Sequence, residues 1–222
     1  MLPLIAEKGL AEFCDVFCET GVFSPDESRV ILEKAKSLGL GLKMHAEEIN
    51  NSGAALLAAE LGCISSEHLI KINDAGIKAL SASGSIAVCL PCTSFYLGES
   101  FAPAREMINQ KLPLAIATDF NPGSSPNLNL QLAMNMACYR YKMTPAEILT
   151  AVTLNAAAAI GRAEEIGSLE EGKLADIVIW DSKDLDYIFY RYGSNLVKTV
   201  IKRGQSVITR LDCHLPPIQR LE

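Results

Sequence analysis

An apolar run that ends at an acid decides the fold: Leu112-Pro113-Leu114-Ala115-Ile116-Ala117-Thr118-Asp119, followed by the loop Phe120-Asn121-Pro122-Gly123. A short apolar run bounded by turn residues is typical of a strand buried on both faces, as in the parallel sheet of an α/β barrel. Asp119 then lies at the carboxyl end of the strand, where barrel enzymes place their catalytic groups. The run therefore predicts an α/β enzyme, or part of one.

Two further strand-like runs end in side chains that bind metals or move protons. Residues 41–44 lead into His45-Ala46-Glu47-Glu48, and residues 63–67 lead into His68. A lone histidine at a strand end is more often an ordinary polar residue with a hydrogen-bond partner. Because the carboxyl ends of parallel strands meet at one edge of a sheet, His45, His68 and Asp119 together favour a functional site.

Composition limits the class of protein. The chain has 222 residues, 49% of them hydrophobic, which is enough to bury a sizeable core. A net charge of −6 without clusters of Lys or Arg excludes the electrostatic pattern of a nucleic-acid-binding protein, so a small-molecule substrate is expected. The longest apolar runs are interrupted by Ser, Gly and Pro, and the first residues lack a secretory signal. These features predict a soluble cytoplasmic protein without membrane contact.

The cysteines are predicted to be core thiols. There are seven, an odd number spread through apolar surroundings, which argues against a disulfide framework. Cys89 and Cys92 have the spacing of a metal-binding pair, but no second pair or histidine accompanies them. We therefore expect two small buried side chains.

Strand-like and helix-like segments alternate between residues 13 and 141, which predicts five βα units. The expected strands are 13–19, 41–45, 63–68, 85–91 and 112–119. Ser24, followed by Pro25 and Glu27, is expected to cap the start of one helix, and a capping box at Thr144 begins a long helix that extends to about residue 160. A closed (β/α)8 barrel needs eight such units. Two antiparallel hairpins, 167–181 and 197–207, are expected next. The sequence thus predicts a partial barrel over residues 1–166 and a small β-rich segment over residues 167–222.

Five motifs are similar to the C-terminal half of the imidazolonepropionase family, within the amidohydrolase superfamily: Asp15-Val16-Phe17-Cys18-Glu19, residues 43–48, Glu67-His68-Leu69, residues 117–124, and residues 143–147. Residues 172–178 resemble the tail of amidohydrolases generally. The resemblance implies a (β/α)8 metal-dependent hydrolase barrel with a β-sandwich appendage, one zinc or iron ion, and a homodimer. The implied reaction converts 4-imidazolone-5-propanoate and water to N-formimino-L-glutamate, in histidine degradation.

The resemblance also assigns roles to residues. It implies metal ligation by His45 and Asp119, catalysis by His68, Glu48 and Asp119, and substrate binding by Glu48, Asn121, Gly123 and Ser124. The family's His-x-His pair has no counterpart among the three histidines, of which the third is His214. On this basis we expect a truncated chain that is inactive alone.

Several alternatives stay open at this point. Another mononuclear amidohydrolase, such as a deaminase of a cyclic amidine, would release ammonia instead. The chain could also be a non-catalytic fragment, with no function or as the inactive partner of a full-length copy. Glu47 and Glu48 could form a solvated pair, and residues 121–123 could be an ordinary turn. Glu19 is expected to be structural rather than catalytic, for example by pairing with a Lys or Arg.

Overall fold

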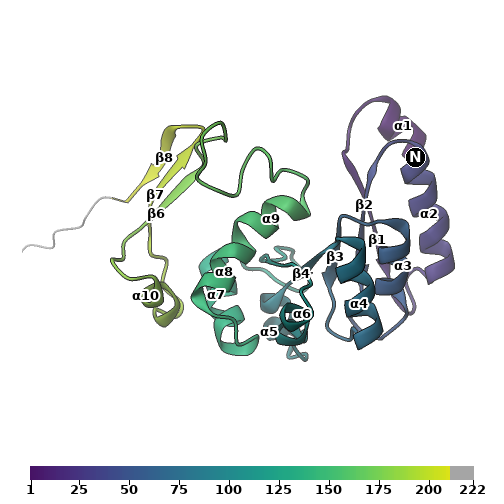
Figure 1. Cartoon of the computed structure of the whole chain (residues 1–222), viewed down its shortest axis with the longest axis horizontal. Helices are drawn as coiled ribbons and strands as arrows, with labels where there is room; N and C mark the ends of the chain where they lie inside the picture. Colours follow the sequence, from purple (N-terminus) through teal and green to yellow (C-terminus); the bar gives the residue numbers. More distant parts are fainter. Residues whose placement is uncertain (211–222) are drawn as a thin grey trace, which may run out of the picture.

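The computed structural model describes residues 1–210 and contains two separate sheets (Figure 1). The larger sheet has five parallel strands in sequence order: β1 (Phe13–Cys18), β2 (Gly41–Ala46), β3 (Ser65–His68), β4 (Ile86–Cys89) and β5 (Leu114–Ile116). The smaller sheet is antiparallel and contains β6 (Ile177–Trp180), β7 (Val197–Lys202) and β8 (Gln205–Thr209). The five predicted βα units and the α/β class are confirmed. His214 lies outside the described residues.

Ten helices connect or cover these strands within residues 1–210: α1 (Leu2–Glu7), α2 (Pro25–Ser37), α3 (Ala54–Leu61), α4 (Asp74–Ser83), α5 (Pro91–Leu97), α6 (Ala104–Asn109), α7 (Leu130–Arg140), α8 (Pro145–Val152), α9 (Leu154–Ala159) and α10 (Leu185–Tyr190). Capping boxes begin α2 at Ser24 and α8 at Thr144, as predicted. The short helices α1, α5 and α10 were not predicted. No helix among residues 1–210 combines the length and apolar character needed to cross a bilayer.

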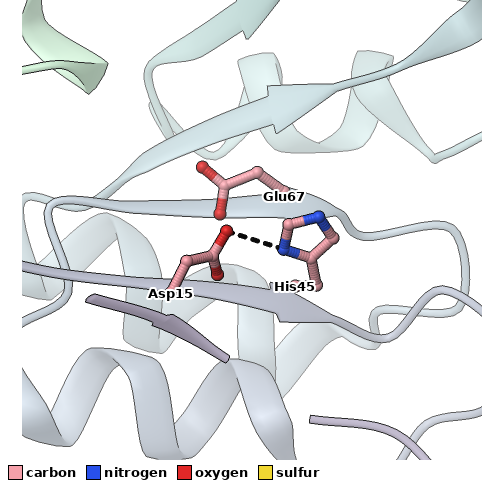
Figure 2. A group of neighbouring side chains, drawn as sticks. All are labelled: Asp15, His45 and Glu67. Atoms are coloured by element: carbon pink, nitrogen blue, oxygen red, sulfur yellow. Dashed lines mark ion pairs between the residues drawn. The ribbon is translucent and has the colours of Figure 1, made fainter. Parts of the chain in front are cut away.

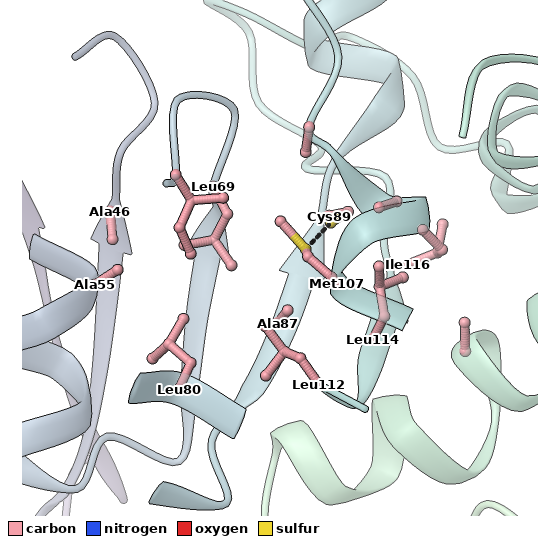
Figure 3. Close-up of a cluster of buried hydrophobic side chains, with 14 of the residues drawn as sticks. Ala46, Ala55, Leu69, Leu80, Ala87, Cys89, Met107, Leu112, Leu114 and Ile116 are labelled. Carbon is pink, nitrogen blue, oxygen red and sulfur yellow. Dashed lines mark hydrogen bonds between the residues drawn. The ribbon is translucent and has the colours of Figure 1, made fainter. Parts of the chain in front are cut away.

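The two faces of the parallel sheet have different partners, because side chains alternate along each strand. On β4, Ala87 and Cys89 belong to the larger apolar cluster, which also contains Met107 of α6 (Figure 3). Val88, on the opposite face of β4, packs in a smaller cluster with Ala159 of α9. Cys18, Cys63, Cys89 and Cys92 are buried, whereas Cys14 and Cys138 are partly exposed, so the prediction of core thiols holds for four of the six cysteines that the structure describes. One face of the sheet is thus covered by helices, and α9 occupies part of the other.

The long helix predicted to reach residue 160 is wrong, since the structure breaks it into α8 and α9. Thr153 has φ −126° and ψ −88°, outside the helical region. Its hydroxyl donates to the carbonyl oxygen of Leu149 at 2.6 Å, a bond that competes with regular helix geometry. The break redirects the Ala-rich segment, so that Ala159 packs against the face of β4 and β5 that the other helices leave free.

The first predicted hairpin, over residues 167–181, is also wrong in part. Only β6 forms there, and it pairs with β7 rather than with residues before it. The segment before β6 contacts residues 163 and 168 instead: the ammonium group of Lys173 donates to the carbonyl oxygen of Ala163 and to Ser168 Oγ, both at 2.7 Å. The predicted hairpin of β7 and β8 is present.

Candidate active site

The carboxyl end of the parallel sheet gathers the polar residues singled out in the sequence. His45 is the penultimate residue of β2, His68 is the last residue of β3, and Asp119 follows β5 by three residues. Left-handed backbone is unusual for residues other than glycine and concentrates at functional sites. Here it occurs at Glu47, His68 and Asp119, with φ of 55°, 72° and 54°. The strand ends therefore turn sharply where the candidate residues lie.

The turn at His68 brings its ring beside that of His45. Ala46 pairs with His68 in the sheet, so strict alternation would place His68 on the helix-covered face with Ala46. Instead, the two histidine rings lie 5.2 Å apart between centroids. The left-handed backbone at His68 ends the alternation and accounts for this position.

His45 is surrounded by carboxylates. Its Nδ1 lies 2.9 Å from Asp15 Oδ2, an ion-pair distance (Figure 2). Burial lowers the pKa of His45, but contact with Asp15 and the charges of Glu67 and Asp119 outweigh it, so the pKa is raised. His45 is thus held in an acidic environment.

Asp15, His45 and Glu67 form a group of potential metal ligands (Figure 2). One ligand-type atom from each lies within 4.8 Å of the others. They come from three adjacent strands, since Glu67 pairs with His45 in the register of β2 and β3. Asp15 and Glu67 were not predicted from the sequence as site residues. The available signal for Asp15 was its place between the apolar residues Cys14 and Val16, whereas Glu67 lies between Ser66 and His68 and no such alternation marks it.

Lys43, two residues before His45 on β2, neutralises part of the negative charge of these carboxylates. Its Nζ lies 2.8 Å from Glu67 Oε1 and donates to the carbonyl oxygen of Ala159 at 3.1 Å and to Ser65 Oγ. Ser65 Oγ in turn donates to Glu67 Oε1 at 2.5 Å. Glu67 Oε2 is buried without a hydrogen-bond partner. One carboxylate oxygen is therefore fixed, and the other is free.

His68 and Glu48 form a second pair, with 3.5 Å between Nε2 and Oε2. Burial and the nearby His45 lower the pKa of His68 to about 4, so the ring is neutral at pH 7. Burial also raises the pKa of Glu48. The charge of His45 lowers this pKa, but the charges of Asp119 and Glu19 raise it, and the net shift is upward. Glu48 is thus a group that can take up or release a proton closer to neutral pH.

Asp119 is fixed by Thr93, near the start of α5. Thr93 Oγ1 donates to Asp119 Oδ2 at 2.5 Å, and Thr93 is almost fully buried. The contact joins the segments after β4 and β5, and Thr93 was not predicted from the sequence as a neighbour of the site. No sequence pattern marked it, because α5 was not predicted.

The loop after Asp119 is held together by its own side chains. Asn121 Oδ1 accepts from the backbone N–H groups of Gly123 and Ser124 at 2.9 and 2.7 Å. Asn121 Nδ2 donates to Ser124 Oγ at 2.9 Å and to the carbonyl oxygen of Asp119 at 2.8 Å. The predicted donors to substrate therefore bind one another here, and a substrate would have to replace these bonds.

The expectation that Glu19 pairs with a Lys or Arg is wrong. Glu19 is 1% exposed, and its carboxylate accepts three backbone N–H groups, those of Thr20, Ile49 and Asn50. Burial raises the pKa of Glu19, but these hydrogen bonds lower the pKa by more than burial raises it. The net shift is downward, and the group stays ionised at neutral pH.

The donor set fits a transition-metal ion. Imidazole nitrogen and carboxylate oxygen are ligands that both zinc and iron accept. Glu67 Oε2 and His68 Nδ1 are buried polar atoms without a hydrogen-bond partner in the described structure, as expected where a further group binds. The contact of Asp15 with His45 Nδ1 resembles the carboxylate–histidine arrangement that orients metal-bound histidines.

Comparison with known proteins identifies the class. The model of the amidohydrolase family matches residues 19–207. Solved structures that share the fold include a zinc-bound adenosine deaminase from Xanthomonas campestris (TM-score 0.72, 24% identity, 84% of this chain and 49% of that one) and ochratoxinase from A. niger (TM-score 0.74, 21% identity, 92% and 52%). The chain belongs to the amidohydrolase family, and its five-stranded sheet corresponds to part of that family's barrel.

Relatives with higher sequence identity indicate a particular family of enzymes within this class. The chain is 54% identical to the imidazolonepropionase of Bacillus velezensis and 55% identical to that of Alkaliphilus oremlandii, each over 211 residues. Each match covers 95% of this chain and 50% of the relative. The chain thus spans about half the length of the curated relatives it matches, and the predicted resemblance to imidazolonepropionase is confirmed.

Proposed function

We propose that this chain carries half of an imidazolonepropionase active site and takes part in hydrolysis of 4-imidazolone-5-propanoate to N-formimino-L-glutamate. The observation that carries the proposal is the convergence of His45, Glu48, His68 and Asp119 at one edge of the sheet, in a chain 54% identical to such an enzyme. The pathway would be histidine degradation.

His45 and Asp119 would hold the metal ion, zinc or iron, with Asp15 orienting the ring of His45. The resemblance implies that a His-x-His pair supplies further ligands. The 222 residues contain no His-x-His pair. When bound, such an ion lowers the pKa of a coordinated water to about 7 and polarises the substrate carbonyl.

The other residues would handle protons and charge. Water adds to the ring carbonyl carbon, the ring C–N bond breaks, and the departing nitrogen takes a proton. The neutral His68 ring is suited to donate a hydrogen bond to the carbonyl oxygen as negative charge develops there. Asp119 would accept the proton of the attacking water, and Glu48, with its raised pKa, would move a proton to the nitrogen.

The loop of Asn121, Gly123 and Ser124 would bind the substrate's ring or propionate after exchanging its internal hydrogen bonds for bonds to the substrate.

Three further expectations remain part of the proposal: a cytoplasmic location, a homodimer as the resemblance implies, and a division into residues 1–166 and 167–222. The separate antiparallel sheet of β6–β8 supports that division.

Complementation tests the proposal. The chain is mixed or fused with the half of the Bacillus velezensis relative that it does not match, loaded with zinc, and given 4-imidazolone-5-propanoate. We expect N-formimino-L-glutamate to form, with neither half active alone. Ammonia as the product would indicate a deaminase instead, and a folded, zinc-loaded assembly without turnover would contradict the proposal.

A further inference from the structure

The loop that carries Glu48 is fastened at two points. On one side, Glu47 Oε1 accepts the backbone N–H groups of Gly53 and Ala55 at 3.1 and 3.2 Å. On the other side, the Glu19 carboxylate reaches across from the end of β1 to the residues directly after Glu48. Glu48 thus lies between two anchors in a segment without regular secondary structure.

Each oxygen of the Glu19 carboxylate accepts hydrogen bonds from a different part of the backbone. Oε2 accepts from Ile49 N at 2.9 Å and from Asn50 N at 3.2 Å, whereas Oε1 accepts from Thr20 N at 2.8 Å. Glu19 is itself held in place, because its backbone N–H donates to the carbonyl oxygen of Phe23 at 3.0 Å. Both carboxylate oxygens are used, and hydrogen bonds to a charged acceptor are about twice as strong as neutral ones.

We infer that Glu19 is a positioning residue: its carboxylate fixes the backbone after Glu48, so that the Glu48 side chain stays against His68. Without this anchor, the two backbone N–H groups would seek other partners, and the loop would lose the geometry that places Glu48 Oε2 3.5 Å from His68 Nε2. The inference rests on the proposed function only in giving Glu48 a role in the reaction.

Two substitutions separate the reach of the carboxylate from its charge. Glu19→Gln keeps the length but turns an NH2 group toward one set of backbone N–H groups. Glu19→Asp keeps the charge, but its carboxylate is one methylene short of Ile49 and Asn50. If the hydrogen bonds position Glu48, both variants lose its contact with His68.

The readouts do not depend on turnover. Hydrogen exchange in the 222-residue chain reports on the amides of Ile49 and Asn50, and we expect about tenfold or faster exchange in both variants. The ring 15N signals of a chain with three histidines report on His68. Its Nε2 signal should move at least halfway to its position in Glu48→Ala, which defines loss of the contact.

A matched control is Glu147→Gln. The Glu147 carboxylate also accepts a backbone N–H, that of Thr144 at 2.7 Å, but lies on α8 and pairs with Arg105. The Glu147→Gln substitution should lower the stability of the chain without moving the ring 15N signal of His68. Wild-type exchange and wild-type His68 signals in Glu19→Asp would overturn the inference, and this variant decides the question if Glu19→Gln does not fold. A shifted signal in a chain that fails the complementation assay would leave Glu19 as inferred and contradict only the proposed function.

Discussion

At the scale of single residues, His45 and Asp119 are expected to govern metal affinity. Each supplies one ligand in the proposed site, so His45→Ala and Asp119→Ala should each weaken zinc binding at least about tenfold. His68→Ala is the comparison, because the proposal gives it charge stabilisation and not ligation, and it should retain zinc. Competition titration of the purified chain with a zinc chelator measures the three affinities. Loss of zinc in His68→Ala would move that residue among the ligands.

His68 should also make stability depend on pH. Its pKa in the folded chain is about 4, below the ordinary value of 6.5, because burial and His45 disfavour its charged form. Below pH 6.5 the unfolded chain therefore binds more protons than the folded chain, and stability falls as the pH drops from 6.5 to 4. His68 should contribute a loss of roughly 2 kcal/mol by pH 5.

Urea unfolding in the presence of EDTA, at pH 7.5 and at pH 5, measures this loss. His68→Gln cannot titrate and should show the smaller difference between the two pH values. An equal difference in both proteins would mean that His68 is protonated as readily in the folded chain as in the unfolded one.

At the scale of elements, α10 depends on buried polar contacts with α7. Asn135, which is fully buried, donates through Nδ2 to the carbonyl oxygens of Ile188 and Phe189 at 3.3 and 2.8 Å. Asn135→Leu removes both donations and should cost about 1–3 kcal/mol. Faster hydrogen exchange should be concentrated in α10. Asn109→Leu is the control, since Asn109 is exposed on α6, and a similar loss there would argue against the role of Asn135.

At the scale of the whole molecule, the parallel sheet has two open edges. Within residues 1–210, β1 and β5 each pair with one neighbouring strand in this sheet. Apolar side chains lie beside the β1 edge, among them Phe23, which is 42% exposed. Open strands and exposed apolar surface both promote association. The chain is therefore expected to self-associate as its concentration rises.

Sedimentation velocity at increasing concentration tests this expectation. Phe23→Glu should shift the distribution toward monomer, because it places a charge beside the β1 edge. Leu169→Glu, which replaces an apolar side chain that is 77% exposed in another part of the chain, should not. A monomer at every concentration in the unsubstituted chain would contradict the prediction.

The sequence by itself determined the parts of the fold that depend on local chemistry. Strand-like runs that alternate with helix-like segments marked all five parallel strands, and Ser24 and Thr144 marked two helix starts, because strand patterns and capping are readable from neighbouring residues. It also placed His45, His68 and Asp119 at strand ends, since the carboxyl ends of parallel strands share one edge.

Only the tertiary structure decided what those residues contact. The break at Thr153 lets Ala159 pack against the sheet, a contact that no local pattern states. The contacts of Asp15 with His45, of Thr93 with Asp119, and of Glu19 with Ile49 and Asn50 join residues 26 to 31 positions apart in the sequence. Burial leaves polar groups only the partners that folding brings within reach, so these pairings arise from the packing of whole strands and loops.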